Sequence, residues 1–102
     1  MDKVGMLKEI LAQNPDDSFA RYGLAIEYAN RNEVEASLGA FGELLTLHPD
    51  YTPGYFMAAQ TLAKAGRRDE AKSRLTEGIA SAIRTGNQHA LGEMQAMLDE
   101  LE

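Results

Sequence analysis

Apolar side chains recur along the chain at steps of three and four residues, the spacing that places them on one face of an α-helix. The stripe is clear at Ala20, Leu24 and Tyr28, and again at Leu38 and Phe41. No segment alternates apolar and polar residues as a half-buried strand does. The pattern therefore predicts an all-α chain of about six helices, near residues 3–13, 17–31, 34–47, 53–65, 69–85 and 88–100.

Residues typical of helix ends separate these segments. Asn32, Gly66 and Gly86 stand just past predicted helix ends, where a left-handed backbone conformation is favoured. Thr52 and Asn87 stand just before the next apolar stripes, and their side chains are expected to cap the helices that follow.

The chain also contains an internal repeat. The segments 14–16 and 48–50 both read Asn or His, then Pro, then Asp, and they lie 34 residues apart. The same shift places Phe41 on Leu75 and Leu7 on Phe41, without a gap. Each unit of the repeat is therefore a pair of helices, and the segment 3–13 corresponds to the second helix of a shortened unit.

A 34-residue pair of helices resembles the tetratricopeptide repeat, whose pattern is W-x₂-L-G-x₂-Y, then A-x₃-F, then P. The first unit reads Arg21-x₂-Leu24-Ala25-x₂-Tyr28, then Ser37-x₃-Phe41, then Pro49. The second unit reads Tyr55-x₂-Ala58-Ala59-x₂-Leu62, then Ala71-x₃-Leu75, then Gly78. Arg21 stands where the pattern has tryptophan, so looser packing is expected there. The resemblance implies an α-α superhelix, a right-handed solenoid of antiparallel helix pairs.

On this resemblance the chain is one domain, residues 1–102. The expected parts are a half-repeat helix at 3–13, a first repeat at 15–48, a second repeat at 49–86 and a C-terminal capping helix within 87–102. That arrangement amounts to three helix pairs, about the minimum for a stable stack.

Proteins with this repeat usually bind other proteins or peptides on a concave surface lined by the first helix of each pair. Carried over by register, the expected partner-binding groove is largely apolar and consists of Phe19, Tyr22, Ile26, Asn30, Phe56, Met57, Gln60 and Lys64. Such a groove suits an amphipathic helix or an apolar extended peptide. The competing interpretation is that the aromatic side chains belong to the core, with Phe56 and Met57 covered by the last helix.

Charge and composition narrow the function further. The chain has 102 residues, with 16 acidic and 10 basic side chains, a net charge of −6 and no cysteine. The absence of cysteine excludes disulfides and thiolate sites. The acidic balance argues against binding to nucleic acid or to a membrane surface. The basic stretch 64–84 lacks the interleaved aromatics that single-strand binding needs.

No apolar run reaches transmembrane length, no secretory or lipidation signal is recognised, and a cytoplasmic protein is expected.

The residues that carry chemistry are few and scattered. His48 and His89 lie far apart in the sequence and have no partners at ligand spacing. His89 and Glu93 share a helix face, where they could hold a weak surface metal. A solvated pair is the favoured interpretation. His48 is expected to meet the last carbonyls of the helix that it ends. No acid–base constellation is present, so we expect no catalytic residue, no metal and no cofactor.

Two functions follow as hypotheses. The first is a non-enzymatic adaptor that binds a peptide or helix of an unknown partner protein in the apolar groove. The alternative is a structural module that forms a homodimer through its terminal helices, with candidate seams at Val4, Leu7, Leu11, Met94, Met97 and Leu101.

Overall fold

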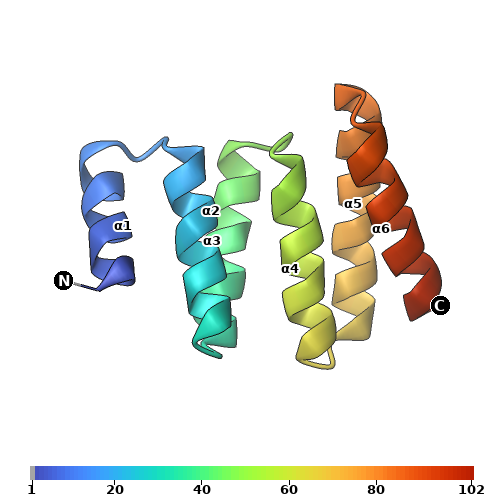
Figure 1. The fold of residues 1–102 in the computed structure, drawn as a ribbon, viewed down its shortest axis with the longest axis horizontal. Helices are drawn as coiled ribbons and strands as arrows, with labels where there is room; N and C mark the ends of the chain where they lie inside the picture. The colour runs from blue at the N-terminus through green and yellow to red at the C-terminus, as the bar shows by residue number, and fades with distance from the viewer. Residues whose placement is uncertain (1) are drawn as a thin grey trace. The chain divides into compact units, whose positions relative to one another are not determined.

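A computed structural model describes residues 2–102, and within that range every regular element is an α-helix. The helices are α1 (Lys3–Gln13), α2 (Ser18–Asn30), α3 (Val34–Leu47), α4 (Thr52–Lys64), α5 (Arg68–Thr85) and α6 (Gln88–Leu101). Each boundary lies within one residue of the bounds predicted from periodicity, so the six-helix prediction is confirmed. The chain divides into two compact units, Met1–His48 with α1 to α3 and Pro49–Glu102 with α4 to α6 (Figure 1).

Short polar side chains begin three of the helices. Asp2, Asp17 and Asn87 each accept a hydrogen bond from the backbone N–H three residues later, at 2.8, 2.9 and 3.0 Å. These bonds satisfy N–H groups that the first helical turn leaves without a backbone partner. The cap predicted at Asn87 is confirmed. Thr52 makes no such bond, because its hydroxyl is buried against Ser81 inside the second unit, and the cap predicted there is wrong.

Left-handed residues follow three helix ends, as the sequence predicts. Asn32 has φ 60°, Gly66 has φ 79° and Gly86 has φ 68°. Asparagine and glycine tolerate this conformation better than other residues, which allows the chain to turn sharply out of each helix.

The first unit is built around α2, which packs against both α1 and α3. Phe41 and Leu44 of α3 are fully buried, and burying such a side chain stabilises the fold by about 1.5–3 kcal/mol. The buried Ser37 hydroxyl donates a hydrogen bond of 2.8 Å to the Ala25 carbonyl, so α2 and α3 are also joined by a polar contact. On the other side of α2, a Cβ atom built on Gly23 would lie 3.5 Å from Leu7 of α1, an ordinary van der Waals distance, so this contact does not itself require glycine.

The second unit packs α5 against both α4 and α6. Leu75 and Met94 are fully buried, and Tyr55 is only 5% exposed. Gly78 of α5 lies where these helices approach most closely, since a Cβ atom there would be 2.6 Å from the Tyr55 Cβ and closer still to the Met94 sulfur. A small residue at position 78 is therefore required by this packing, as the repeat pattern predicts.

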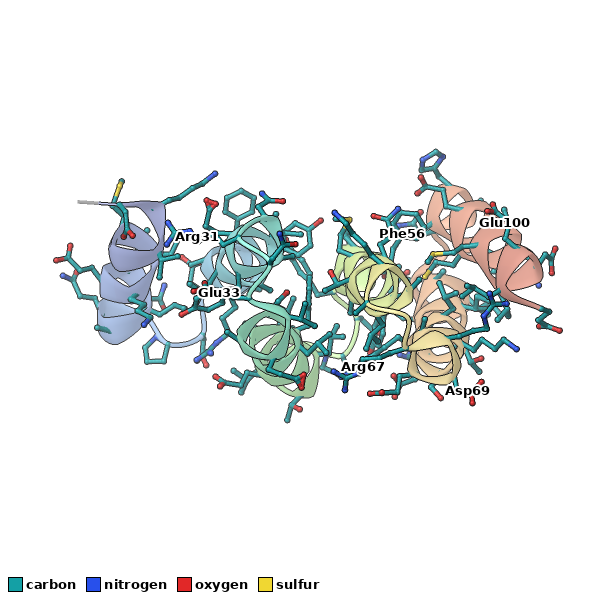
Figure 2. All side chains as sticks on the ribbon, turned by 90° about the horizontal axis from the view of Figure 1, so that it is seen from below. Arg31, Glu33, Phe56, Arg67, Asp69 and Glu100 are labelled. Atoms are coloured by element: carbon teal, nitrogen blue, oxygen red, sulfur yellow. The ribbon has the colours of Figure 1, made fainter. Side chains whose placement is uncertain are left out.

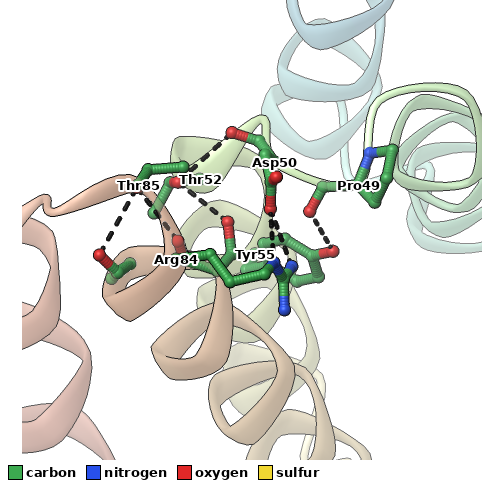
Figure 3. Close-up of polar contacts among 8 residues, drawn as sticks. Pro49, Asp50, Thr52, Tyr55, Arg84 and Thr85 are labelled. Atoms are coloured by element: carbon green, nitrogen blue, oxygen red, sulfur yellow. Dashed lines mark hydrogen bonds and ion pairs between the residues drawn. The ribbon is translucent and has the colours of Figure 1, made fainter.

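A polar cluster closes one end of the second unit, where the segment before α4 meets the end of α5 (Figure 3). The buried hydroxyls of Thr52 and Ser81 lie 3.0 Å apart. The Arg84 guanidinium donates from Nε and Nη2 to one Asp50 carboxylate oxygen, at 3.0 and 2.7 Å. These bonds hold the pKa of Asp50 below its usual value and raise the pKa of Arg84. The cluster fixes the start of α4 against the end of α5.

None of the helices within residues 2–102 combines the length and the apolar character needed to span a membrane.

Candidate functional site

Four predicted binding residues share one face of α2. Residues 19, 22, 26 and 30 follow one another at steps of three and four, which keeps them within one stripe of the helix. The Phe19 side chain is 75% exposed, Tyr22 and Ile26 are half-buried, and Asn30 is exposed. Burial raises the pKa of the Tyr22 hydroxyl. The core interpretation is therefore wrong for Phe19, which presents a large aromatic surface to solvent.

The other four predicted binding residues lie on α4 in the second unit. Phe56 and Met57 are half-buried, whereas Gln60 and Lys64 are exposed. Phe56 is labelled on α4 in Figure 2. These two apolar side chains are thus neither fully covered core nor freely exposed anchors. The face of α2 belongs to the first unit and this face of α4 to the second, and each is described separately. A single concave groove that joins the two faces remains a prediction.

A cleft in the first unit was not predicted from the sequence. It has a volume of about 350 Å³ and lies between α1, α2 and α3. The Arg21 side chain, 16% exposed, is one wall, and its Nη1 donates to a Glu43 carboxylate oxygen at 2.7 Å. The sequence does contain a signal of this cleft, because Arg21 stands where the repeat pattern has a tryptophan. What the sequence could not show is that no other side chain fills the space.

An open stripe on α1 was also missed. Met6 is 53% exposed and Ile10 is 44% exposed, and together with Glu9 and Gln13 they line a shallow hollow. Of the residues predicted as dimer seams, Val4 is 9% exposed and Met94 is fully buried, whereas the others are half-buried, namely Leu7, Leu11, Met97 and Leu101. In the repeat register α1 corresponds to the second helix of a pair, and Met6 and Ile10 correspond to Ala40 and the buried Leu44 of α3.

The two histidines make ordinary surface contacts. The His48 Nε2 lies 2.9 Å from the Asp16 carbonyl oxygen, to which it donates. Its partner is therefore the segment before α2 and not the end of its own helix, which corrects the prediction. His89 is 87% exposed and lies 3.5 Å from the Glu93 carboxylate. Within residues 2–102, no three His, Asp or Glu side chains are grouped so that they could hold a metal ion.

The helix pairs, their 34-residue register and the small residues between them define a class, the helical repeat proteins. No family model matches the chain. A tetratricopeptide repeat domain protein from Salinibacter ruber, solved by NMR, is 31% identical; the similarity covers 87% of this chain and 90% of that one, with a TM-score of 0.81. A TPR repeat-containing protein of Pseudomonas aeruginosa is 25% identical over 96 residues, covering 94% of this chain and 91% of that protein. The crystal structure of PcrH in complex with the chaperone binding region of PopD is 17% identical, covers 96% of this chain and 75% of that one, and has a TM-score of 0.88, which shows a shared fold.

This chain belongs to the tetratricopeptide repeat family. The resemblance first seen in the repeat pattern is thereby confirmed.

Proposed function

We propose that this chain is a non-enzymatic protein-interaction module, and that the face of α2 is the main contact for a peptide or helix of a partner protein. The observation that carries the proposal is the 75% exposure of Phe19, next to the half-buried Tyr22 and Ile26. An exposed aromatic ring flanked by apolar side chains is the usual anchor of a protein interface. The predicted residues of α4 supply a second contact in the proposal.

The relatives support the proposal without identifying the partner. PcrH was crystallised in complex with the chaperone binding region of PopD, and this chain shares the PcrH fold. The proposed mechanism needs only burial of apolar surface and shape complementarity, and it assigns no chemical step to His48 or His89.

The test is an affinity pull-down from lysate of the source cells with three forms of the chain. The first is the wild type and the second is Phe19→Glu. The third is Ile83→Glu, the matched control, because Ile83 is an apolar side chain of α5 with a similar exposure of 65%. Circular dichroism establishes that all three are folded. The proposal predicts a protein that is captured by the wild type and by Ile83→Glu but not by Phe19→Glu. Equal capture by all three forms, or loss with both variants, would contradict it.

A homodimer is the second candidate, and the exposed Met6 and Ile10 of α1 are the observation that favours it. Two of the six residues predicted as seams, Val4 and Met94, are buried and are left out of this surface. Sedimentation equilibrium separates the two functions. The dimer predicts twice the chain mass of 11.2 kDa, reduced to one chain mass by Ile10→Glu, and it fails if the wild type is a monomer at micromolar concentration.

A further inference from the structure

The two repeats have different residues at the position where the repeat pattern has tryptophan. Arg21 and Tyr55 are 34 residues apart and so occupy the same place in their repeats. Each reaches back to the carbonyl of the proline six residues earlier: Arg21 Nε donates to Pro15 at 2.9 Å, and the Tyr55 hydroxyl donates to Pro49 at 2.6 Å. The polar contact is the same, but the second unit has an aromatic ring where the first has a guanidinium.

The residues that surround Arg21 are also smaller than those that surround Tyr55. The second unit is filled at this place, since Tyr55 is 5% exposed and the charges of Arg74 and Glu77, paired at 3.0 Å on α5, act on its hydroxyl. The first unit has Ala40 in place of Arg74 but retains a glutamate at Glu43, in place of Glu77. Glu43 and Ala40 both line the cleft. By the repeat register, the cleft of the first unit lies beside Arg21 and at Ala40, which stand where the second unit has an aromatic ring and the long side chain of Arg74.

The α3 side of the cleft is lined by small residues. These residues are Ala36, Gly39 and Ala40. A Cβ atom built on Gly39 would meet nothing within 4 Å. A volume of about 350 Å³ is at the small end of ligand sites, large enough for one ring system. Tyr28 of α2 and Lys8 of α1 complete the lining.

The fixed guanidinium of Arg21 favours a planar ring as the occupant of the cleft. The Arg21 guanidinium is held by Pro15 and Glu43, so its plane is fixed before any ligand arrives. The Glu43 carboxylate offsets the charge of Arg21, and Lys8 adds one positive charge to the lining. A planar guanidinium stacks well on an aromatic face, and the Tyr28 ring offers an aromatic neighbour. An aromatic ring could therefore stack on the Arg21 guanidinium while the bond to Glu43 is kept.

We propose that this cleft is a second binding site, which takes one aromatic side chain of a partner protein beside Arg21, in the repeat that lacks the aromatic residue found at Tyr55 in the other. Residues 21 and 28 lie about half a turn around α2 from Phe19 and Ile26, so the site is on the opposite face from the proposed peptide contact. The two proposals are independent, and either can fail without the other.

The test uses N-acetyl-L-tryptophan amide as the probe and the ¹⁵N-labelled full chain, followed by NMR. We expect saturable shifts centred on residues 36–43 and on the Arg21 Nε–H, with a Kd on the order of 1–10 mM, as one ring can provide. N-acetyl-L-leucine amide and acetate should give no comparable saturation.

Two matched variants locate the site. Gly39→Leu fills the cleft from an open helical position and should weaken probe binding by more than about tenfold. Gly92→Leu makes the same change on α6, where a Cβ atom also meets nothing within 4 Å, and should leave binding unchanged. Thermal unfolding shows that both are folded. The proposal is overturned if the probe gives no saturable shifts, if acetate or the leucine amide binds equally well, or if binding survives in Gly39→Leu.

Discussion

Adding one methyl group at three helical glycines should change stability in opposite directions, according to what surrounds each one. At Gly39 and Gly92 a Cβ atom meets nothing within 4 Å, whereas at Gly78 it lies 2.6 Å from the Tyr55 Cβ and closer still to the Met94 sulfur. Alanine is favoured over glycine within a helix by roughly 1 kcal/mol. The substitutions at Gly39 and Gly92 should therefore each stabilise the chain by about 0.5–1 kcal/mol.

At Gly78 the same gain is outweighed by overpacking. The Met94 side chain is flexible and can move, but the Tyr55 Cβ is attached directly to the backbone of α4, so relief requires a shift of that helix. Overpacking of a dense core costs about 1–3 kcal/mol, and we take the upper end here because of the Tyr55 contact. After subtracting the gain in helix propensity, Gly78→Ala should destabilise the chain by about 2 kcal/mol.

Thermal unfolding followed by circular dichroism measures all three variants. For a chain of this size 1 kcal/mol corresponds to about 4–8 °C in Tm, so Gly78→Ala should lower the Tm by about 8 °C or more. Gly39→Ala and Gly92→Ala should raise it by about 3–5 °C. The packing described for α4, α5 and α6 is refuted if Gly78→Ala is as stable as the wild type. The open surroundings of the other two glycines are refuted if their variants are destabilised.

Three further predictions concern other parts of the fold. Ser81→Ala should destabilise the chain by about 1 kcal/mol in urea titrations, because it removes the buried contact of 3.0 Å and leaves the Thr52 hydroxyl only its longer bond of 3.3 Å to the Asp50 carbonyl; an unchanged midpoint would contradict this. The pKa of Asp50 is held below its ordinary value of 3.8 by Arg84, so the stability that Asp50 contributes is present above that pH and lost as pH falls through the lower, folded value. Asp50→Asn should therefore flatten the fall of Tm between about pH 4 and pH 2, and an identical fall in both proteins would refute the contact. Arg21→Trp should raise the Tm by about 4 °C or more by filling the cleft of the first unit, and a lower Tm would show that the lost bonds to Pro15 and Glu43 matter more.

The fold could be predicted from the sequence because each helix carries its own signals. Periodic apolar residues mark the buried faces, and Asn32, Gly66 and Gly86 mark helix ends through a backbone conformation that few other residues adopt. The repeat register then identified positions where helices approach, such as Gly78. These signals are local or recur at a fixed period, so they can be recognised without knowing the tertiary structure.

The surface could be predicted only in part, because exposure depends on which neighbours reach a side chain. Periodicity placed Phe19 and Tyr22 on one face of α2, yet Phe19 is largely exposed and Tyr22 is half-buried. Thr52 has the sequence context of a helix cap, and only the tertiary structure shows that its hydroxyl lies against the buried Ser81 instead. The cleft at Arg21 arises from small residues on α3 together with a missing ring on α2, a combination that no single motif records.

The proposed function is tested most directly by the affinity of the captured partner segment for the wild type and for Phe19→Glu, measured by isothermal titration calorimetry with Ile83→Glu as the control. Loss of a central aromatic anchor costs about 2 kcal/mol or more, so Phe19→Glu should weaken binding by about thirtyfold or more while Ile83→Glu binds like the wild type. Equal affinities for the wild type and Phe19→Glu would show that the partner does not bind the face of α2.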